Sequence, residues 1–280
     1  MTFPKMEMKM TQRINKILSE AGLASRRKAD ELIESGRVML NGKILRELGA
    51  KADWGKDSIR VDGREIPGPS EKIYLMLNKP FGYVCTLNDP QGRHIVTDLL
   101  RDVPQRVYPV GRLDFDSMGL VLLTNDGDFS FQMTHPKYHV PRTYKVTVQG
   151  DVSEKDINAI KNGVELEDGF IGVSSAALIG RQGDKSLIRL TITQGRNRIV
   201  RRMIEAIGFS VVHLVRIGFG NLELGDLKVG KYRHLEPEEV KELMEMSSQK
   251  GKGKTKDSRI RGFKDSSARS KGTRGKEKMI

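Results

Sequence analysis

The residues best suited to chemistry lie between positions 111 and 123, where an arginine and two carboxylates directly precede an apolar run. Residues 111–116 read Gly-Arg-Leu-Asp-Phe-Asp, and a strand-like stretch follows at 120–123. A carboxylate beside an arginine in such a position can act as a nucleophile or a base. Asp114 and Asp116 could instead be turn residues that hydrogen-bond to their own backbone. The other motifs of the chain decide between these interpretations.

Two nearby carboxylates can also hold a divalent cation, so Asp116 is a candidate metal ligand beside Asp114. A transition-metal site would add histidine or cysteine ligands in a cluster. The histidines are scattered along the chain at His94, His135, His139, His213 and His234. We therefore expect no catalytic metal.

A second group of reactive side chains lies in an arginine-rich helix predicted near 198–207. Residues 196–202 contain four arginines, and Gly208 is a plausible stop. The apolar stripe of this helix consists of Ile199, Val200, Met203, Ile204 and Ile207. This spacing leaves Arg198, Arg201 and Arg202 on or beside the polar side. The arginines could form a solvated face, bind phosphate groups, or keep a buried carboxylate charged.

Length and composition indicate two domains with short extensions. The chain has 280 residues and one cysteine, Cys85, so it has no intramolecular disulfide. No apolar run approaches the roughly 18 residues of a membrane span, and residues 1–10 lack the apolar core of a secretory signal. We expect a flexible N-terminus at 1–10 and a soluble, cytoplasmic protein.

The charge of the chain indicates a polyanionic partner. The formal net charge is +13, and residues 247–280 contribute twelve Lys and Arg against three Asp and Glu. Nucleic acid is the first candidate and an acidic membrane surface the second. The 247–280 segment has too little apolar surface to offset the entropy of ordering, so we expect a disordered basic tail. The tail could be a solubilising appendage or an arm for phosphate backbones.

Residues 11–68 predict a small module with two helices and a hairpin. Ser25 is a good N-cap for the second helix, and Asn41-Gly42 is typical of a hairpin turn. Cations in the first turn of a helix are mildly unfavourable, which indicates an anionic partner for those that follow Ser25. The basic residues of this candidate phosphate-binding face are Arg13, Lys16, Arg26, Arg27, Lys28, Arg37 and Lys43. A solvated charged surface is the alternative.

After a linker at 69–72, residues 73–246 predict an α+β domain. An apolar run at 73–77 ends at Pro80, and alternation at 143–148 and 186–193 predicts half-buried strands. Ser153 and Asp156 form an approximate capping box for a helix. Strand-rich segments with irregularly placed helices favour an α+β sheet domain.

Residues 11–68 resemble the small RNA-binding module named after ribosomal protein S4. The matching segments are Arg-Ile-Asn-Lys-Ile-Leu at 13–18, Gly-Leu-Ala-Ser-Arg-Arg at 22–27 and Gly-Arg-Val-x-x-Asn-Gly at 36–42. The resemblance implies binding to structured RNA and implies nothing about catalysis.

Residues 11 to about 246 resemble the RsuA/RluB group of bacterial ribosomal-RNA pseudouridine synthases. The matching motifs are Leu-Asn-Lys-Pro-x-Gly at 77–82, Gly-Arg-Leu-Asp at 111–114 and Gly-Arg-Asn-Arg-x-Val-Arg-Arg-Met at 195–203. The resemblance implies an S4-like domain followed by a catalytic domain with a mainly antiparallel mixed sheet. It departs at Ile199, where glutamine is common, and at Arg142, where lysine is common.

The resemblance also implies site residues and a reaction. Asp114 is the implied catalytic aspartate, Tyr144 the active-site tyrosine and Arg201 the partner of the aspartate. Such enzymes break the bond between a uridine base and its ribose and rejoin the base through carbon 5, without a cofactor. The carboxylate could attack as a nucleophile or remove a ribose proton to give a glycal. From its strand alone, Tyr144 would be a core aromatic residue.

The expected partner is ribosomal RNA with a flipped-out uridine, either as free RNA or within a ribosomal subunit precursor, and we expect no membrane partner. The residues expected to bind it are Arg13, Lys16, Arg26, Arg27, Lys28, Arg37, Lys79, Arg112, Arg196, Arg198 and Arg202. The basic tail resembles the RluB branch more than the RsuA branch, which implies 23S rather than 16S ribosomal RNA. Nothing demands a dimer, so we expect a monomer. A non-catalytic RNA-binding factor for ribosome assembly is the alternative, and it would not need Asp114.

Overall fold

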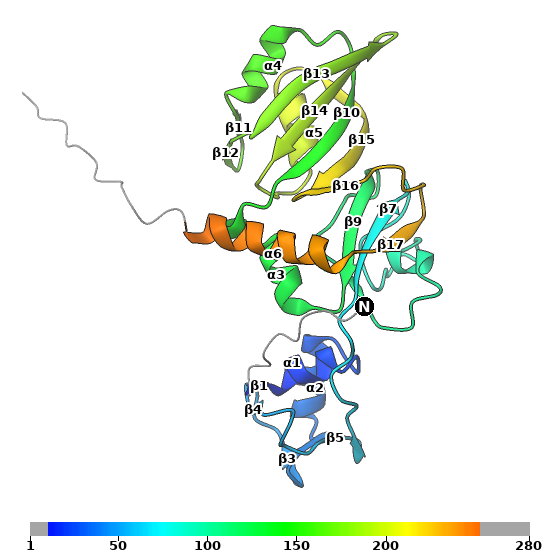
Figure 1. Ribbon diagram of the computed structural model, residues 1–280, viewed down its shortest axis with the longest axis vertical. Helices are drawn as coiled ribbons and strands as arrows, with labels where there is room; N and C mark the ends of the chain where they lie inside the picture. The colour runs from blue at the N-terminus through cyan, green and yellow to red at the C-terminus, as the bar shows by residue number, and fades with distance from the viewer. Residues whose placement is uncertain (1–10, 253–280) are drawn as a thin grey trace, which may run out of the picture.

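The computed structural model describes residues 11–252, which form two domains joined by a short linker (Figure 1). The expected flexibility of residues 1–10 and disorder of residues 253–280 concern segments that lie outside the described residues. Within 11–252, no helix is both long enough and apolar enough to cross a membrane.

The N-terminal domain has its own apolar core, built by two helices on small sheets. Its elements are β1 (Gln12–Arg13), α1 (Ile14–Glu20), α2 (Arg26–Glu34), β2 (Val38–Leu40), β3 (Lys43–Leu45), β4 (Lys51–Ala52), β5 (Ile59–Val61) and β6 (Arg64–Glu65). The Ser25 side chain accepts a hydrogen bond from the Lys28 N–H at 3.2 Å, which confirms the predicted N-cap. The predicted hairpin turn is also confirmed, because Asn41 and Gly42 have φ angles of 49° and 80°.

The second domain is built on a nine-stranded sheet, which is mixed and mainly antiparallel as predicted. Its main strand order is β13-β14-β10-β15-β9-β7-β17, and β16 and β8 pair with β15 and β9. The strands are β7 (Tyr74–Lys79), β8 (Tyr108–Pro109), β9 (Met118–Thr124), β10 (Arg142–Gln149), β13 (Ser175–Gln182), β14 (Lys185–Ile192), β15 (Ser210–Phe219), β16 (Leu222–Glu223) and β17 (Tyr232–His234). The pair of β9 and β15 is parallel, and the other pairs of this sheet are antiparallel.

Helices cover the two ends of this sheet on different faces, with the strands β7 and β9 buried between two cores (Figure 1). The remaining elements are η1 (Val96–Leu99), α3 (Gly127–Thr134), η2 (Pro136–Tyr138), α4 (Glu154–Lys161), the hairpin β11 (Val164–Leu166) and β12 (Gly169–Ile171), α5 (Ile199–Ala206) and α6 (Pro237–Lys252). Helices α4 and α5 pack on the first core, whereas α3 and α6 pack on the second. The predicted capping box of α4 is confirmed, with Ser153 and Asp156 bonded reciprocally.

Two expectations about helices are wrong in part. Helix α6 continues to Lys252, so the stretch 247–252 is helical rather than disordered. Ser247 is fully buried, and its hydroxyl donates to the Met244 carbonyl of the preceding helical turn at 2.7 Å. In α5, Arg201 is only 6% exposed and lies on the buried side, not the polar side.

Candidate active site

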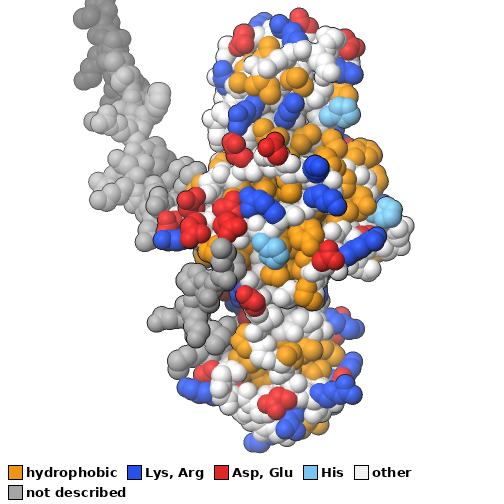
Figure 2. Space-filling model, turned by 45° about the vertical axis from the view of Figure 1, so that its right-hand side comes forward, with side chains coloured by type: hydrophobic (Ala, Val, Ile, Leu, Met, Phe, Trp, Pro, Cys, Tyr) orange, Lys and Arg blue, Asp and Glu red, His pale blue; other side chains and the backbone are white. Residues whose placement is uncertain are grey.

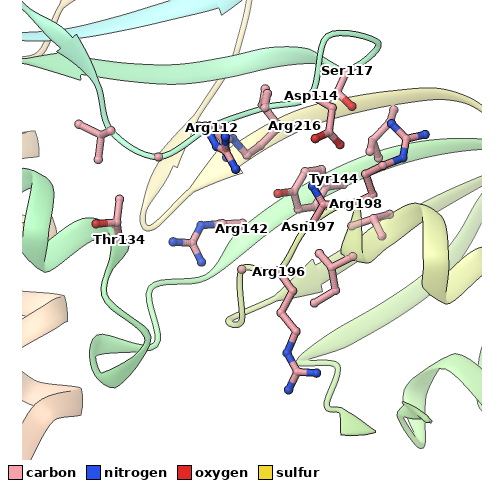
Figure 3. A pocket seen from close by; sticks show the side chains of 17 residues that line it. Arg112, Asp114, Ser117, Thr134, Arg142, Tyr144, Arg196, Asn197, Arg198 and Arg216 are labelled. Atoms are coloured by element: carbon pink, nitrogen blue, oxygen red, sulfur yellow. The ribbon is translucent and has the colours of Figure 1, made fainter. Parts of the chain in front are cut away.

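A cavity of about 250 Å³ opens where β9, β10 and β15 meet the segment before α5 (Figure 3). Asp114 is the one carboxylate among the described residues that line it, and Tyr144 also lines it. The cationic lining consists of Arg112, Arg142, Arg196, Arg198 and Arg216. One carboxylate among five guanidinium groups can react with a substrate while the arginines neutralise its phosphates.

The turn that carries Asp114 is positioned by the start of β9. The Asp114 carbonyl accepts a hydrogen bond from the Ser117 N–H at 3.1 Å, and β9 then runs parallel to β15. Gly119 pairs with Arg216 there at a φ of +100°, and a Cβ atom on Gly119 would lie 2.2 Å from the Arg216 carbonyl oxygen. Only glycine permits this approach, which brings the Asp114 turn against β15.

Lys79 supports this turn from inside the protein. Its side chain is fully buried, and its ammonium donates to the carbonyls of Pro80, Phe115 and Ser117 at 3.1, 3.4 and 2.7 Å. Burial lowers the pKa of Lys79 to about 8, against the attraction of nearby acids that include Asp114. The prediction that Lys79 binds RNA is therefore wrong, because the amine has no exposed surface and holds backbone carbonyls.

Arg201 contacts the same turn, but it pairs with a different carboxylate from the one expected. Its guanidinium donates to the Asp116 carbonyl at 3.0 Å and lies 3.2 Å from the Asp116 carboxylate. A further bond reaches the Val211 carbonyl at 3.3 Å, which connects the turn, α5 and β15. The expectation that Arg201 pairs with Asp114 is corrected accordingly, and Arg201 holds the turn from behind the cavity.

Two pocket arginines carried no prediction. Arg216 is 2% exposed, and its Nε donates to the Leu120 carbonyl at 2.6 Å while its Nη2 has no partner in the described structure. Arg142 donates to the Met133 and Thr193 carbonyls, and burial lowers its pKa. The signal for Arg216 was its place on the buried face of an alternating strand, two residues after Leu214.

Tyr144 satisfies both interpretations of its strand. It is 6% exposed and belongs to the first core, and it also lines the cavity, where Figure 3 shows it between Asp114 and Arg142. Its ring is therefore fixed by packing and presents one side to the cavity.

The other arginines of the third motif are already paired with carboxylates. Arg198 has a left-handed φ of 47° and lies 3.3 Å from the Asp116 carboxylate at the cavity rim. Arg196 donates to the Asp168 carbonyl at 2.5 Å, and Arg202 pairs with the Asp168 carboxylate. Asp168 lies in the β11–β12 hairpin, so Arg202 joins this hairpin to α5 and does not line the cavity.

The cations of the N-terminal domain divide into free and paired groups. Arg13, Arg26 and Arg27 are exposed, and their side chains make no hydrogen bond or ion pair within the described residues. Arg37 forms a two-bond pair with Asp62 at 2.7 and 2.5 Å, and Lys28 pairs with Glu31. Figure 2 shows Lys and Arg side chains around the outer end of this domain on the face in view.

Lys16 lies at the junction of the two domains. Its ammonium is 2.9 Å from the Asp128 carboxylate of α3 and 3.6 Å from Glu20. Lys16 is therefore paired with acids in this structure, and its place on the RNA-binding face stays a prediction. Within 11–252, no group of three or more His, Cys, Asp or Glu residues could hold a metal ion.

Comparison with known proteins agrees with this architecture. The chain matches the RNA pseudouridylate synthase family over residues 73–206 and the S4 domain over residues 12–57. It therefore belongs to the RNA pseudouridylate synthases, which isomerise uridine, and membership favours an enzyme over a non-catalytic binding factor.

Particular relatives cover most of the chain. An uncharacterized RNA pseudouridine synthase of Aquifex aeolicus is 43% identical, covering 84% of this chain and 94% of the relative. Ribosomal large subunit pseudouridine synthase B of Bacillus subtilis is 44% identical, covering 83% of this chain and 95% of the relative. A crystal structure of a pseudouridylate synthase aligns with a TM-score of 0.59 and 34% identity, covering 82% of this chain and 99% of that one.

Proposed function

We propose that this enzyme isomerises a specific uridine in the ribosomal RNA of the large subunit, with Asp114 as the reacting carboxylate. The observation that carries the proposal is the cavity, in which Asp114 faces Tyr144 and is surrounded by arginines. The large-subunit target is supported by the Bacillus relative of that name. The protein acts as a cytoplasmic monomer on this RNA or on a subunit precursor.

The cavity has the size and charge for one flipped nucleoside. Its volume of about 250 Å³ is below the usual range for drug-sized ligands, and a base-paired duplex would not fit. Extruding a base costs a few kcal/mol and is easiest in a loop or bulge. Arg112, which is exposed at the cavity, can neutralise the phosphates that flank the extruded nucleotide.

Inside the cavity, the Asp114 carboxylate reacts at the ribose while Tyr144 packs against the uracil ring. The bond between the uracil ring nitrogen and the ribose breaks, the base rotates, and a new bond joins the ribose to carbon 5 of the base. Carbon 5 then loses its hydrogen as a proton, and the freed ring nitrogen gains a proton. Lys79 and Arg201 hold the Asp114 turn, and they are positioning residues because their groups bind Ser117, Phe115 and Asp116. Preorganised support of this kind maintains the geometry of a reacting group.

The N-terminal domain binds RNA through phosphate contacts that position the substrate without selecting its sequence. The residues proposed for this role are the unpaired Arg13, Arg26 and Arg27.

The proposed function is tested by mapping the product in unmodified transcripts. Purified protein is incubated with small- and large-subunit ribosomal RNA, and carbodiimide adducts are located by primer extension. We expect one new stop in the large-subunit RNA, absent with Asp114→Asn and present with Asp226→Asn, a matched change at an exposed aspartate without a bonding partner among residues 11–252. A primer-extension stop in the small-subunit RNA alone would refute the proposed large-subunit target. A stop produced by the Asp114→Asn variant would refute the proposed role of Asp114.

A further inference from the structure

Two exposed phenylalanine rings lie next to the reacting turn and have no role in the proposed chemistry. Phe81 is 60% exposed and Phe115 is 42% exposed, and their ring centroids are 5.9 Å apart. Single exposed apolar residues are ordinary, but a paired aromatic surface beside a cavity is typical of a binding site.

The backbone of Phe115 belongs to the same turn that presents Asp114 and is held by hydrogen bonds. The Phe115 carbonyl accepts hydrogen bonds from the Gly82 N–H at 3.0 Å and from the Lys79 ammonium at 3.4 Å. Asp114 lines the cavity, as Figure 3 shows, while the next residue projects its ring into solvent. The Phe115 ring is thus exposed directly beside a residue of the cavity lining, although it does not itself line the cavity.

A guanidinium group that is paired with a carboxylate lies over one ring of this aromatic surface. The Arg93 guanidinium carbon lies 5.9 Å from the Phe115 ring centroid. Its orientation is set by two hydrogen bonds to the Asp89 carboxylate, at 2.9 and 2.6 Å. Asp89 and Arg93 lie in a loop whose ends are joined by a hydrogen bond from the Val84 N–H to the His94 carbonyl at 2.9 Å. The surface is thus ordered before any ligand binds.

We propose that Phe115 and Phe81 form a stacking surface for an unpaired base adjacent to the target uridine. The inference rests on the proposed function. When one nucleotide of a strand occupies the cavity, its neighbours stay at the mouth, where aromatic faces and arginine recognise unstacked bases. The preferred substrate is therefore a loop or bulge in which a nucleotide next to the target is also unpaired.

The direct test couples a protein change with an RNA change. Phe115→Leu keeps an apolar side chain but removes the stacking face, and we expect kcat/KM on the mapped ribosomal RNA fragment to fall about tenfold. Wild-type protein should show a similar loss on a fragment whose flanking nucleotide is abasic, and combining both changes should add little more. The matched control Phe170→Leu alters an exposed ring that packs on Gly163 of its own hairpin, and its kcat/KM should be unchanged.

A binding measurement separates this inference from the proposed function. Single-stranded RNA with 2-aminopurine should lose fluorescence on binding wild-type protein, and this quenching should disappear with Phe115→Leu while the melting temperature stays the same. Quenching without any isomerisation would support the stacking surface and refute the proposed function. Isomerisation and quenching that both remain at wild-type level with Phe115→Leu would overturn the surface, and would indicate a protein partner for these rings.

Discussion

The two domains use their basic residues in opposite ways. In the N-terminal domain, Arg26 and Arg27 extend into solvent at the start of α2 and have no partner among the described residues. In the catalytic domain, Arg201 and Arg216 are buried and donate to backbone carbonyls of the turn and strand that shape the cavity. The first pair can bind a polyanion without structural cost, whereas the second pair maintains the site.

This difference shows that an arginine motif alone does not define an RNA contact. A guanidinium group has five donors, and backbone carbonyls satisfy them inside a protein as well as phosphates do at its surface. Burial and partners therefore decide which role a given arginine has.

The largest effect should come from removing a buried arginine. Arg201→Ala leaves the Asp116 and Val211 carbonyls without their donor and the Asp116 carboxylate without one of its two arginines. We expect a loss of about 2–3 kcal/mol in the free energy of unfolding and at least a hundredfold loss in turnover. Chemical denaturation and single-turnover kinetics measure both, and wild-type values for either would mean that Arg201 does not support the turn.

A second effect concerns pH and Lys79. Because its pKa is about 8 in the folded protein, the unfolded chain binds more protons between pH 8 and about 10.5, and stability contributed by this group rises with pH there. The unfolding free energy of wild type should therefore rise by about 2–3 kcal/mol relative to that of Lys79→Met across that pH range. Denaturation at several pH values measures it, and a constant difference would contradict the buried ammonium.

A smaller effect is expected from the free cations of the N-terminal domain. Arg26→Ala with Arg27→Ala should weaken RNA binding roughly tenfold, reduce its salt dependence by about two phosphate contacts, and leave the modified uridine unchanged. Arg37→Ala is the matched control, because Asp62 already neutralises that guanidinium. Salt titrations of binding provide the comparison, and equal losses for the control would remove the distinction between free and paired cations.

The smallest effect should come from Lys16 at the domain junction. Lys16→Ala breaks a partly exposed ion pair with Asp128, so stability should fall by less than about 1 kcal/mol. RNA affinity should change less than twofold, and a loss as large as that for the Arg26 and Arg27 pair would place Lys16 on the RNA-binding face.

The features that the sequence predicted correctly depend on neighbouring residues. The Ser25 and Ser153 caps and the Asn41-Gly42 turn are local. The family resemblance named Asp114 and Tyr144, and the structure places both in the lining of one cavity. The partners of Lys79 and Arg201 could not be predicted, because they are distant in the chain. Lys79 binds the carbonyls of Phe115 and Ser117, which lie 36 and 38 residues away. Arg201 binds the carbonyl of Asp116, which lies 85 residues away.

The end of α6 was missed for a different reason. The composition of 247–280 favours disorder, but apolar residues earlier in the helix, including Val240 and Leu243, pack on the second core and carry the helix to Lys252.

The central claim is that Asp114 reacts while the surrounding cations bind and position. Isomerisation through carbon 5 releases the hydrogen of that carbon, so tritium release from ribosomal RNA with 5-tritiated uridine measures the reaction directly. We predict stoichiometric release with wild-type protein, at least about a thousandfold slower release with Asp114→Asn, and RNA affinity for that variant within twofold of wild type. Release by Asp114→Asn at a rate near that of wild type would contradict the account.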